Sequence, residues 1–186
     1  SSRPEGDRPC WNWVWKGRVP HKMRTFAWKV SVRTLATAPC KAKHHVSDSE
    51  TCRLCGDAKD DSFHALITCP GSVLVWHTMR QVWPLPTNDK LINTGPEWLM
   101  SLLADRTEKI RTMIIMLLWR IWSLWNDQLH HKVIPPLEIT KDFLCSYLSS
   151  FDQAQKYSID DIVKGKMSMD EQVDTSAPVN AQRAPW

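Results

Sequence analysis

The chain has 186 residues, of which 42% are hydrophobic and 24% charged, with a net charge of +4. This composition is normal for a globular protein of one domain or one and a half. Six glycines and long helical patterns predict an all-α fold, and eleven tryptophans are far more than a chain of this size usually has. The chain begins without an apolar signal segment, which favours a reducing compartment, the nucleus or cytoplasm, over secretion.

The first part of the chain combines tryptophan with positive charge. Residues 1–10 predict a disordered lead, and the tryptophans of WNWVW (11–15) alternate as they would in an extended segment. A helix is predicted from Val19-Pro20, because proline suits a first helical turn. Its apolar stripe is Met23, Phe26, Ala27, Val30 and Leu35.

Positive charge is concentrated around this helix. Residues 1–83 carry 13 Lys/Arg and 7 Asp/Glu, whereas residues 84–186 carry 11 and 13, and segment 16–45 has no acidic residue. Such a segment is typical of a surface that binds a polyanion, although a solvated helix face without a partner is the alternative. The candidate phosphate-binding residues are Lys22, Arg24, Lys29, Arg33, Lys41 and Lys43.

Four residues, Cys52, Cys55, His64 and Cys69, follow the spacing C-x2-C-x8-H-x4-C. The first pair is followed by a glycine and forms a knuckle that points two sulfurs at one metal. One helical or near-helical turn can bring the histidine and the last cysteine together. Three thiolates and one imidazole are the ligands of a closed tetrahedral zinc site, which organises a chain rather than catalysing a reaction. The sequence therefore predicts bound Zn²⁺.

Other interpretations of the cysteines are disulfides and a redox-active C-x2-C pair. Clustered cysteines in a reducing compartment argue against disulfides, and the βαβ setting of a redox motif is absent. His44 and His45 are rivals to His64 as the nitrogen ligand. The remaining cysteines, which are expected to be plain buried or half-buried thiols, are Cys10, Cys40 and Cys145.

Short helices are predicted on both sides of the knuckle. One runs from Pro39 to His45, and a turn capped by residue 60, 61 or 62 carries His64. Pro70 opens a helix that ends before Pro84. The apolar positions of this helix recur at Val73, Leu74, Trp76, Met79 and Val82.

The second half is also predicted to be helical. A short helix follows Pro96, and a long one runs from Asp105 or Thr107 to about Lys132. The apolar centre of the long helix, 113–125, contains Arg120 and is too short to span a bilayer, so we expect a core helix and no membrane contact. A last amphipathic helix begins after Pro135-Pro136. The predicted divisions are 11–83 for a zinc-binding domain, 84–157 for a helical linker domain and 158–186 for a disordered tail.

An ordered series of residues in segment 11–76 points to a known family. The series is Trp15, Val19-Pro20, Lys22, Phe26, Trp28, the knuckle Cys52–Gly56, His64, Cys69-Pro70 and Val75-Trp76. It resembles the zinc-binding domain of plant LINE-type (non-LTR) retrotransposon reverse transcriptases. Trp119, Trp122 and Asn126 resemble the helix that joins this domain to RNase H in such polyproteins, although Trp125 stands where that pattern has arginine. The resemblance implies a small helical zinc-knuckle domain, followed by a helical bundle segment and a disordered tail.

No catalytic constellation accompanies the metal site. The adjacent aspartate pairs are Asp60-Asp61 and Asp160-Asp161, neither of which resembles a two-metal polymerase or nuclease centre, and there is no glycine-rich phosphate loop. We therefore expect no enzymatic activity, but a zinc-binding module that binds RNA or single-stranded nucleic acid, with a base stacked on a tryptophan of 11–15.

The alternative function is a domesticated, zinc-stabilised protein-interaction scaffold with a host regulatory role. It would bind a host protein through its tryptophan-rich helices. Four tryptophans are instead expected to pack in the core, and these are Trp28, Trp76, Trp119 and Trp122.

Overall fold

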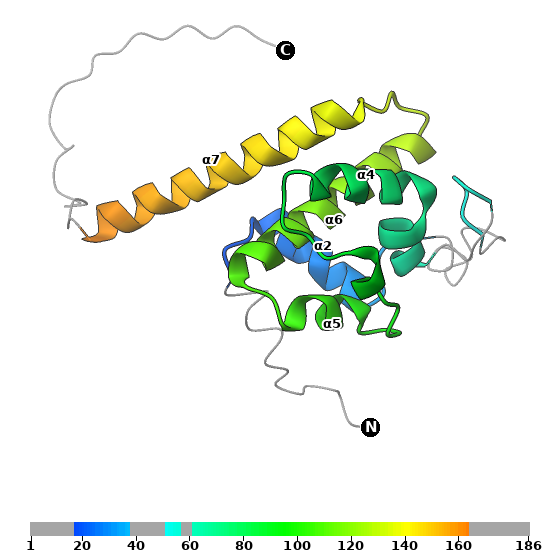
Figure 1. The fold of residues 1–186 in the computed structure, drawn as a ribbon, viewed down its shortest axis with the longest axis horizontal. Helices are drawn as coiled ribbons and strands as arrows, with labels where there is room; N and C mark the ends of the chain where they lie inside the picture. Colours follow the sequence, from blue (N-terminus) through cyan, green and yellow to red (C-terminus); the bar gives the residue numbers. More distant parts are fainter. Residues whose placement is uncertain (1–16, 38–50, 57–60, 164–186) are drawn as a thin grey trace, which may run out of the picture. The chain divides into compact units, whose positions relative to one another are not determined.

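The computed structural model describes residues 17–37, 51–56 and 61–163, and of residues 157–163 only the backbone. Several predictions lie outside these ranges: the tryptophans of 11–15, the helix 39–45 with Lys41, Lys43, His44 and His45, two cysteines (Cys10 and Cys40), and the tail beyond residue 163. The regular elements of the described residues are all helical, which confirms the all-α fold (Figure 1). They are α2 (His21–Ser31), the π-helical turn η1 (His64–Thr68), α4 (Pro70–Arg80), the 3-10 turn η2 (Asn88–Lys90), α5 (Trp98–Ala104), α6 (Glu108–Leu129) and α7 (Leu137–Val163).

Helix α6 is the central element of the core. It contacts α2, α4 and η1, which surround it in Figure 1. The Thr107 side chain caps the helix by accepting a hydrogen bond from the Ile110 N–H at 3.4 Å. Residues 112–118 are all buried, so this apolar helix is a core helix, as predicted. None of the described helices is long and apolar enough to cross a membrane.

Helix α2 packs its apolar stripe inward. Met23, Phe26, Ala27 and Val30 are buried, as their helical spacing predicts. The chain just before this helix is tied to the start of α6, because the Thr112 Oγ1 donates to the Arg18 carbonyl at 3.1 Å.

The prediction that Trp28 packs in the core is wrong, and three of the apolar positions noted in α4 are exposed. In α4 the exposed fractions of Val73, Leu74 and Val82 are 41%, 56% and 47%. The inner face of α4 instead carries Ser72, Val75, Trp76, Thr78 and Met79. In α2 the side chain of Trp28 is 40% exposed rather than in the core. Both helices have apolar residues around more than half of their circumference, so the tertiary contacts select which side is covered.

Helix α7 begins after Pro135-Pro136, as predicted, but it continues to Val163 rather than ending near residue 157. Residues up to Leu148 fall in one compact unit, and residues from Ser149 onward in a second. The first unit contains helices of both the predicted zinc-binding domain and the predicted linker domain. The proposed division at residue 83 stays a prediction.

Candidate metal centre

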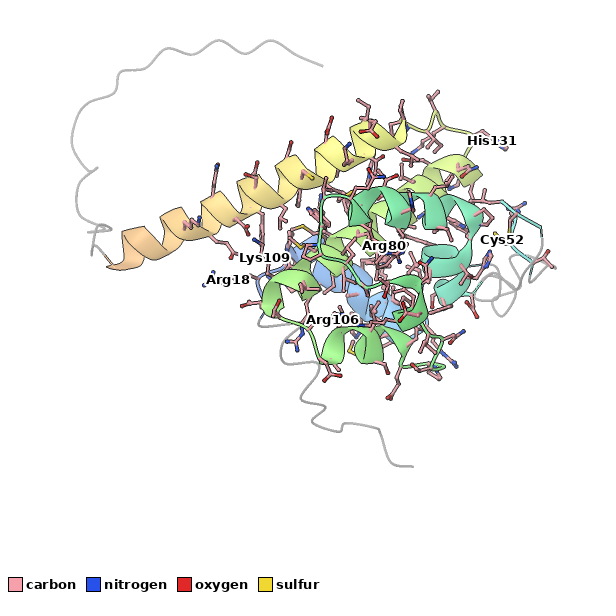
Figure 2. The ribbon with its side chains drawn as sticks, viewed as in Figure 1. Arg18, Cys52, Arg80, Arg106, Lys109 and His131 are labelled. Atoms are coloured by element: carbon pink, nitrogen blue, oxygen red, sulfur yellow. The ribbon has the colours of Figure 1, made fainter. Side chains whose placement is uncertain are left out.

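The four predicted metal ligands lie together in the structure. One ligand atom from each of Cys52, Cys55, His64 and Cys69 lies within 4.8 Å of the others. The Cys55 Sγ is 3.4 Å from the His64 Nε2. Cys52, His64 and Cys69 are buried, whereas Cys55 is half-buried. Figure 2 shows Cys52 on the short segment beside η1.

The first two ligands lie in a tight turn. The Gly56 N–H donates to the Cys52 carbonyl at 2.8 Å, which closes the turn around Cys55. Gly56 has a φ of +77°, in the left-handed region that glycine enters without strain. The glycine after the second cysteine therefore allows both sulfurs to face the same point.

The other two ligands are brought together by a turn wider than an α-helical one. The Cys69 N–H donates to the His64 carbonyl at 2.8 Å, an i to i+5 bond that defines the π-helical turn. The turn begins where the Asp61 Oδ1 accepts a hydrogen bond from the His64 N–H at 2.8 Å, so Asp61 is the predicted capping residue. The x4 spacing between His64 and Cys69 thus matches one turn of this helix.

Side chains from outside the ligand set hold this turn in place. The Thr68 Oγ1 lies 3.1 Å from the His64 Nδ1. A proton on Nδ1 that is donated to Thr68 leaves Nε2, the nitrogen beside Cys55, free to bind a metal. On the other side, the Ser72 Oγ donates to the Ala65 carbonyl at 2.6 Å, and the Trp76 Nε1 donates to the Leu66 carbonyl at 3.0 Å.

These supporting residues were not identified as functional from the sequence. Thr68 follows His64 by four residues, and this helical spacing is the sequence feature that could have predicted contact between the two side chains. Trp76 was expected only as a core residue, and its burial is confirmed, with 1% of its side chain exposed.

The donor set fits a tetrahedral ion. Zinc bound by thiolates and imidazole holds neighbouring ligand atoms about 3.5–3.8 Å apart, close to the 3.4 Å between Cys55 and His64. Burial, followed by the neighbouring Cys52 thiol, raises the pKa of Cys69 from 9.0 to about 12. A cation that binds here must therefore displace a proton from Cys69. Once bound, it would cross-link segment 51–56 to the π-helical turn.

The structure describes four of the six predicted phosphate-binding residues, all in or just after α2. Lys22, Lys29 and Arg33 are exposed, Arg24 is half-buried, and the remaining two lie outside the described residues. Arg33 follows α2 with a φ of +58°, in the left-handed region. The Lys22 Nζ lies 4.3 Å from the centroid of the Trp119 ring.

Comparison with known proteins agrees with the chemistry of the site. Residues 2–76 match the family model described as zinc-binding in reverse transcriptase. An Arabidopsis thaliana protein named "Putative ribonuclease H protein" is 29% identical over 116 residues, which cover 60% of this chain and 18% of that relative. No solved structure matches the chain. The matched segment contains all four residues of the Cys₃His cluster, so residues 2–76 are similar to the zinc-binding domains found in reverse transcriptases.

Proposed function

We propose that this chain is a non-catalytic module of a plant LINE-type retroelement polyprotein, or of a gene derived from one, that binds RNA or other single-stranded nucleic acid. In this proposal the resident metal is zinc, held by Cys52, Cys55, His64 and Cys69, and it has a structural role. A set of three thiolates and one imidazole leaves no open position for a substrate.

One observation carries the nucleic-acid proposal. The cations Arg18, Lys29 and Arg33 are exposed at the two ends of α2, and none of them forms an ion pair with another described residue. Their segment, 16–45, contains no carboxylate. Unpaired cations on a segment without acidic residues suit a chain of phosphates better than they suit a protein partner of mixed charge.

The burial of α6 makes the alternative function less favoured. A scaffold that binds a protein through the tryptophan-rich stretch 113–125 would need an exposed apolar patch there. The residues of this stretch are buried or half-buried. The exposed apolar side chains of α4 could still contact a protein partner. The experiment must therefore be able to distinguish this outcome from nucleic-acid binding.

A binding titration tests the proposal. The zinc-loaded chain is titrated against a single-stranded RNA at about 50 and 200 mM salt. If about four phosphates are neutralised, the affinity should fall about 50-fold between the two salts. Lys29→Gln combined with Arg33→Asn should weaken binding and reduce the salt dependence, and asparagine is chosen because it tolerates the left-handed backbone of residue 33.

The matched control removes one exposed cation elsewhere. Lys90→Gln, in η2, should leave the affinity close to that of the parent. A zinc-loaded parent that does not bind RNA, or that binds it equally at both salts, would contradict the proposal and direct the search to protein partners.

A further inference from the structure

Five side chains from three helices form a surface that combines cations with aromatic rings. We call it the cation–aromatic face, and its members are Lys22 of α2, Trp119 and Arg120 of α6, and Phe143 and Tyr147 of α7. The three helices that supply them are far apart in the sequence, and the fold brings them together.

The two cations of this face lie over its rings. The Lys22 Nζ is 4.3 Å from the Trp119 centroid and 5.2 Å from the Tyr147 centroid. The Arg120 guanidinium lies 4.8 Å from the Phe143 centroid. Lys22 is exposed, the exposed fraction of Phe143 is 37%, and the other three members are half-buried. Solvent therefore reaches the face.

The rings are arranged in a row. Trp119 and Tyr147 are inclined by only 28°, with centroids 6.5 Å apart, and Tyr147 and Phe143 have centroids 5.8 Å apart. Both centroid distances fall in the range of about 4.5–7 Å that offset aromatic pairs adopt. The Lys22 ammonium lies within reach of the Trp119 and Tyr147 rings, so the row of rings carries a positive charge beside it.

Among the described residues, no carboxylate forms an ion pair with the cations of the face. Neither Lys22 nor Arg120 forms an ion pair within the described part of the chain, and the Arg120 Nε is buried without a hydrogen-bond partner there. The Asp127 carboxylate attracts the Arg120 guanidinium only through a longer-range electrostatic interaction. The Oδ1 of Asp127 forms an ion pair with the Lys132 Nζ at 2.9 Å. The face therefore offers positive charge that an anionic ligand could neutralise.

We propose that the cation–aromatic face is where single-stranded nucleic acid stacks its bases, with Lys22 and Arg120 binding the adjacent phosphates. This proposal rests on the proposed function and names the surface that performs it. Stacking of a base on an aromatic ring is stronger than an exposed cation–π contact, so a base can displace the Lys22 ammonium from the rings. The released ammonium can then neutralise a phosphate.

Two more cations extend the positive charge beyond the face. Arg18 lies four residues before Lys22, in the segment that precedes α2, and its main-chain N–H donates to the Glu108 Oε1 at 3.2 Å. Lys109 follows Glu108 in α6, and Figure 2 shows the labelled side chains of Arg18 and Lys109 near the start of this helix. Arg18 and Lys109 are both exposed. They provide a path for a phosphate backbone that leaves the stacked bases.

The test compares single-stranded RNA, single-stranded DNA of the same sequence and the corresponding duplex, each titrated into the zinc-loaded full chain. Tyr147→Leu should weaken single-strand binding about 5- to 100-fold and leave the salt slope unchanged, because it removes a ring but no charge. Tyr147→Phe should bind like the parent. Lys22→Gln should reduce the salt slope by about 0.7. Equal binding of RNA and DNA supports recognition of the bases alone, and tighter binding of RNA supports an additional contact to the 2′-hydroxyl.

Controls separate stacking from folding. Trp28→Leu removes an exposed tryptophan outside the face and should not change the affinity. Zinc stoichiometry and far-ultraviolet circular dichroism must match the parent, and if Tyr147→Leu fails this check, Phe143→Leu replaces it because Phe143 lies nearer the surface.

The outcomes distinguish this proposal from the one on which it rests. Binding by the parent that is unchanged in Tyr147→Leu and Phe143→Leu, or equal binding of duplex and single strand, would overturn the stacking face and leave nucleic-acid binding in place. A parent that does not bind any of the three probes would overturn both.

Discussion

The main-chain N–H of Cys69 donates to the carbonyl oxygen of His64 at 2.8 Å, across five residues rather than four. This bond widens one helical turn so that its first and last residues can face the same ion. A wider turn also leaves its inner carbonyls for partners outside it. Two such carbonyls, those of Ala65 and Leu66, accept hydrogen bonds from Ser72 and Trp76. The metal centre and α4 are therefore one structural unit.

Removing one thiolate should release the metal and loosen the region around it. Cys55→Ser should abolish stoichiometric zinc binding, because on the order of 10 kcal/mol of folding free energy comes from a structural site. Zinc content and the thermal unfolding midpoint measure the effect. Cys145→Ser is the control, since Cys145 is a half-buried free thiol in α7. Equal melting of Cys55→Ser and the parent would show that the site is not structural.

Thr68 should tune the metal centre without binding the metal. Thr68→Val keeps the shape of the side chain but removes the oxygen that lies beside the His64 Nδ1. We expect metal affinity to fall about 10- to 100-fold, as it does when comparable partners of metal-bound histidines are lost. Competition with a chelating dye measures this affinity. Thr68→Ser keeps the hydroxyl and should bind like the parent, and equal affinities in all three proteins would exclude the role.

Metal affinity should increase with pH. With its pKa raised to about 12 by burial, Cys69 is protonated in the metal-free protein at neutral pH, and metal binding releases that proton. The apparent affinity should therefore rise at least about tenfold per pH unit between pH 6 and 8, which competition titrations in a series of buffers can measure. An affinity that does not change with pH would contradict this assignment.

The raised pKa of Cys69 also makes the stability of the metal-free protein depend on pH, but here a higher pH lowers the stability. A thiol whose pKa is raised on folding stabilises the fold while it stays protonated, so this contribution is present below pH 9.0 and is lost as the pH rises toward 12. Unfolding of the metal-free chain with denaturant should show lower stability at the alkaline end of this window.

The hydrogen bonds from α4 should support both stability and metal binding. Ser72→Ala leaves the Ala65 carbonyl buried without its partner, which should cost about 1–3 kcal/mol. Trp76→Phe should cost a similar amount, because it removes the donor to Leu66 and part of a buried ring. Denaturant unfolding measures both. Trp28→Phe, at an exposed position, should change stability by less than about 0.5 kcal/mol, and similar losses at all three positions would contradict the role of these bonds.

The sequence alone was sufficient to predict the helices and the ligand set. Proline marks the starts of α2, α4 and α7, Thr107 caps α6, and the spacing of Cys52, Cys55, His64 and Cys69 predicts the four residues that the structure brings together. These features are local, since each depends on residues a few positions apart, and local preferences are what a linear pattern records.

Only the tertiary structure decided which faces are covered and which distant side chains meet. Helical spacing showed that Val73, Leu74 and Val82 are apolar positions of α4, yet all three are exposed, and the side that donates hydrogen bonds through Ser72 and Trp76 faces inward. Lys22 was predicted only as a phosphate-binding cation, whereas the fold also places it over Trp119 and Tyr147. Contacts between residues so far apart depend on how the helices pack, and helical periodicity shows which residues share a face without showing which neighbour covers it.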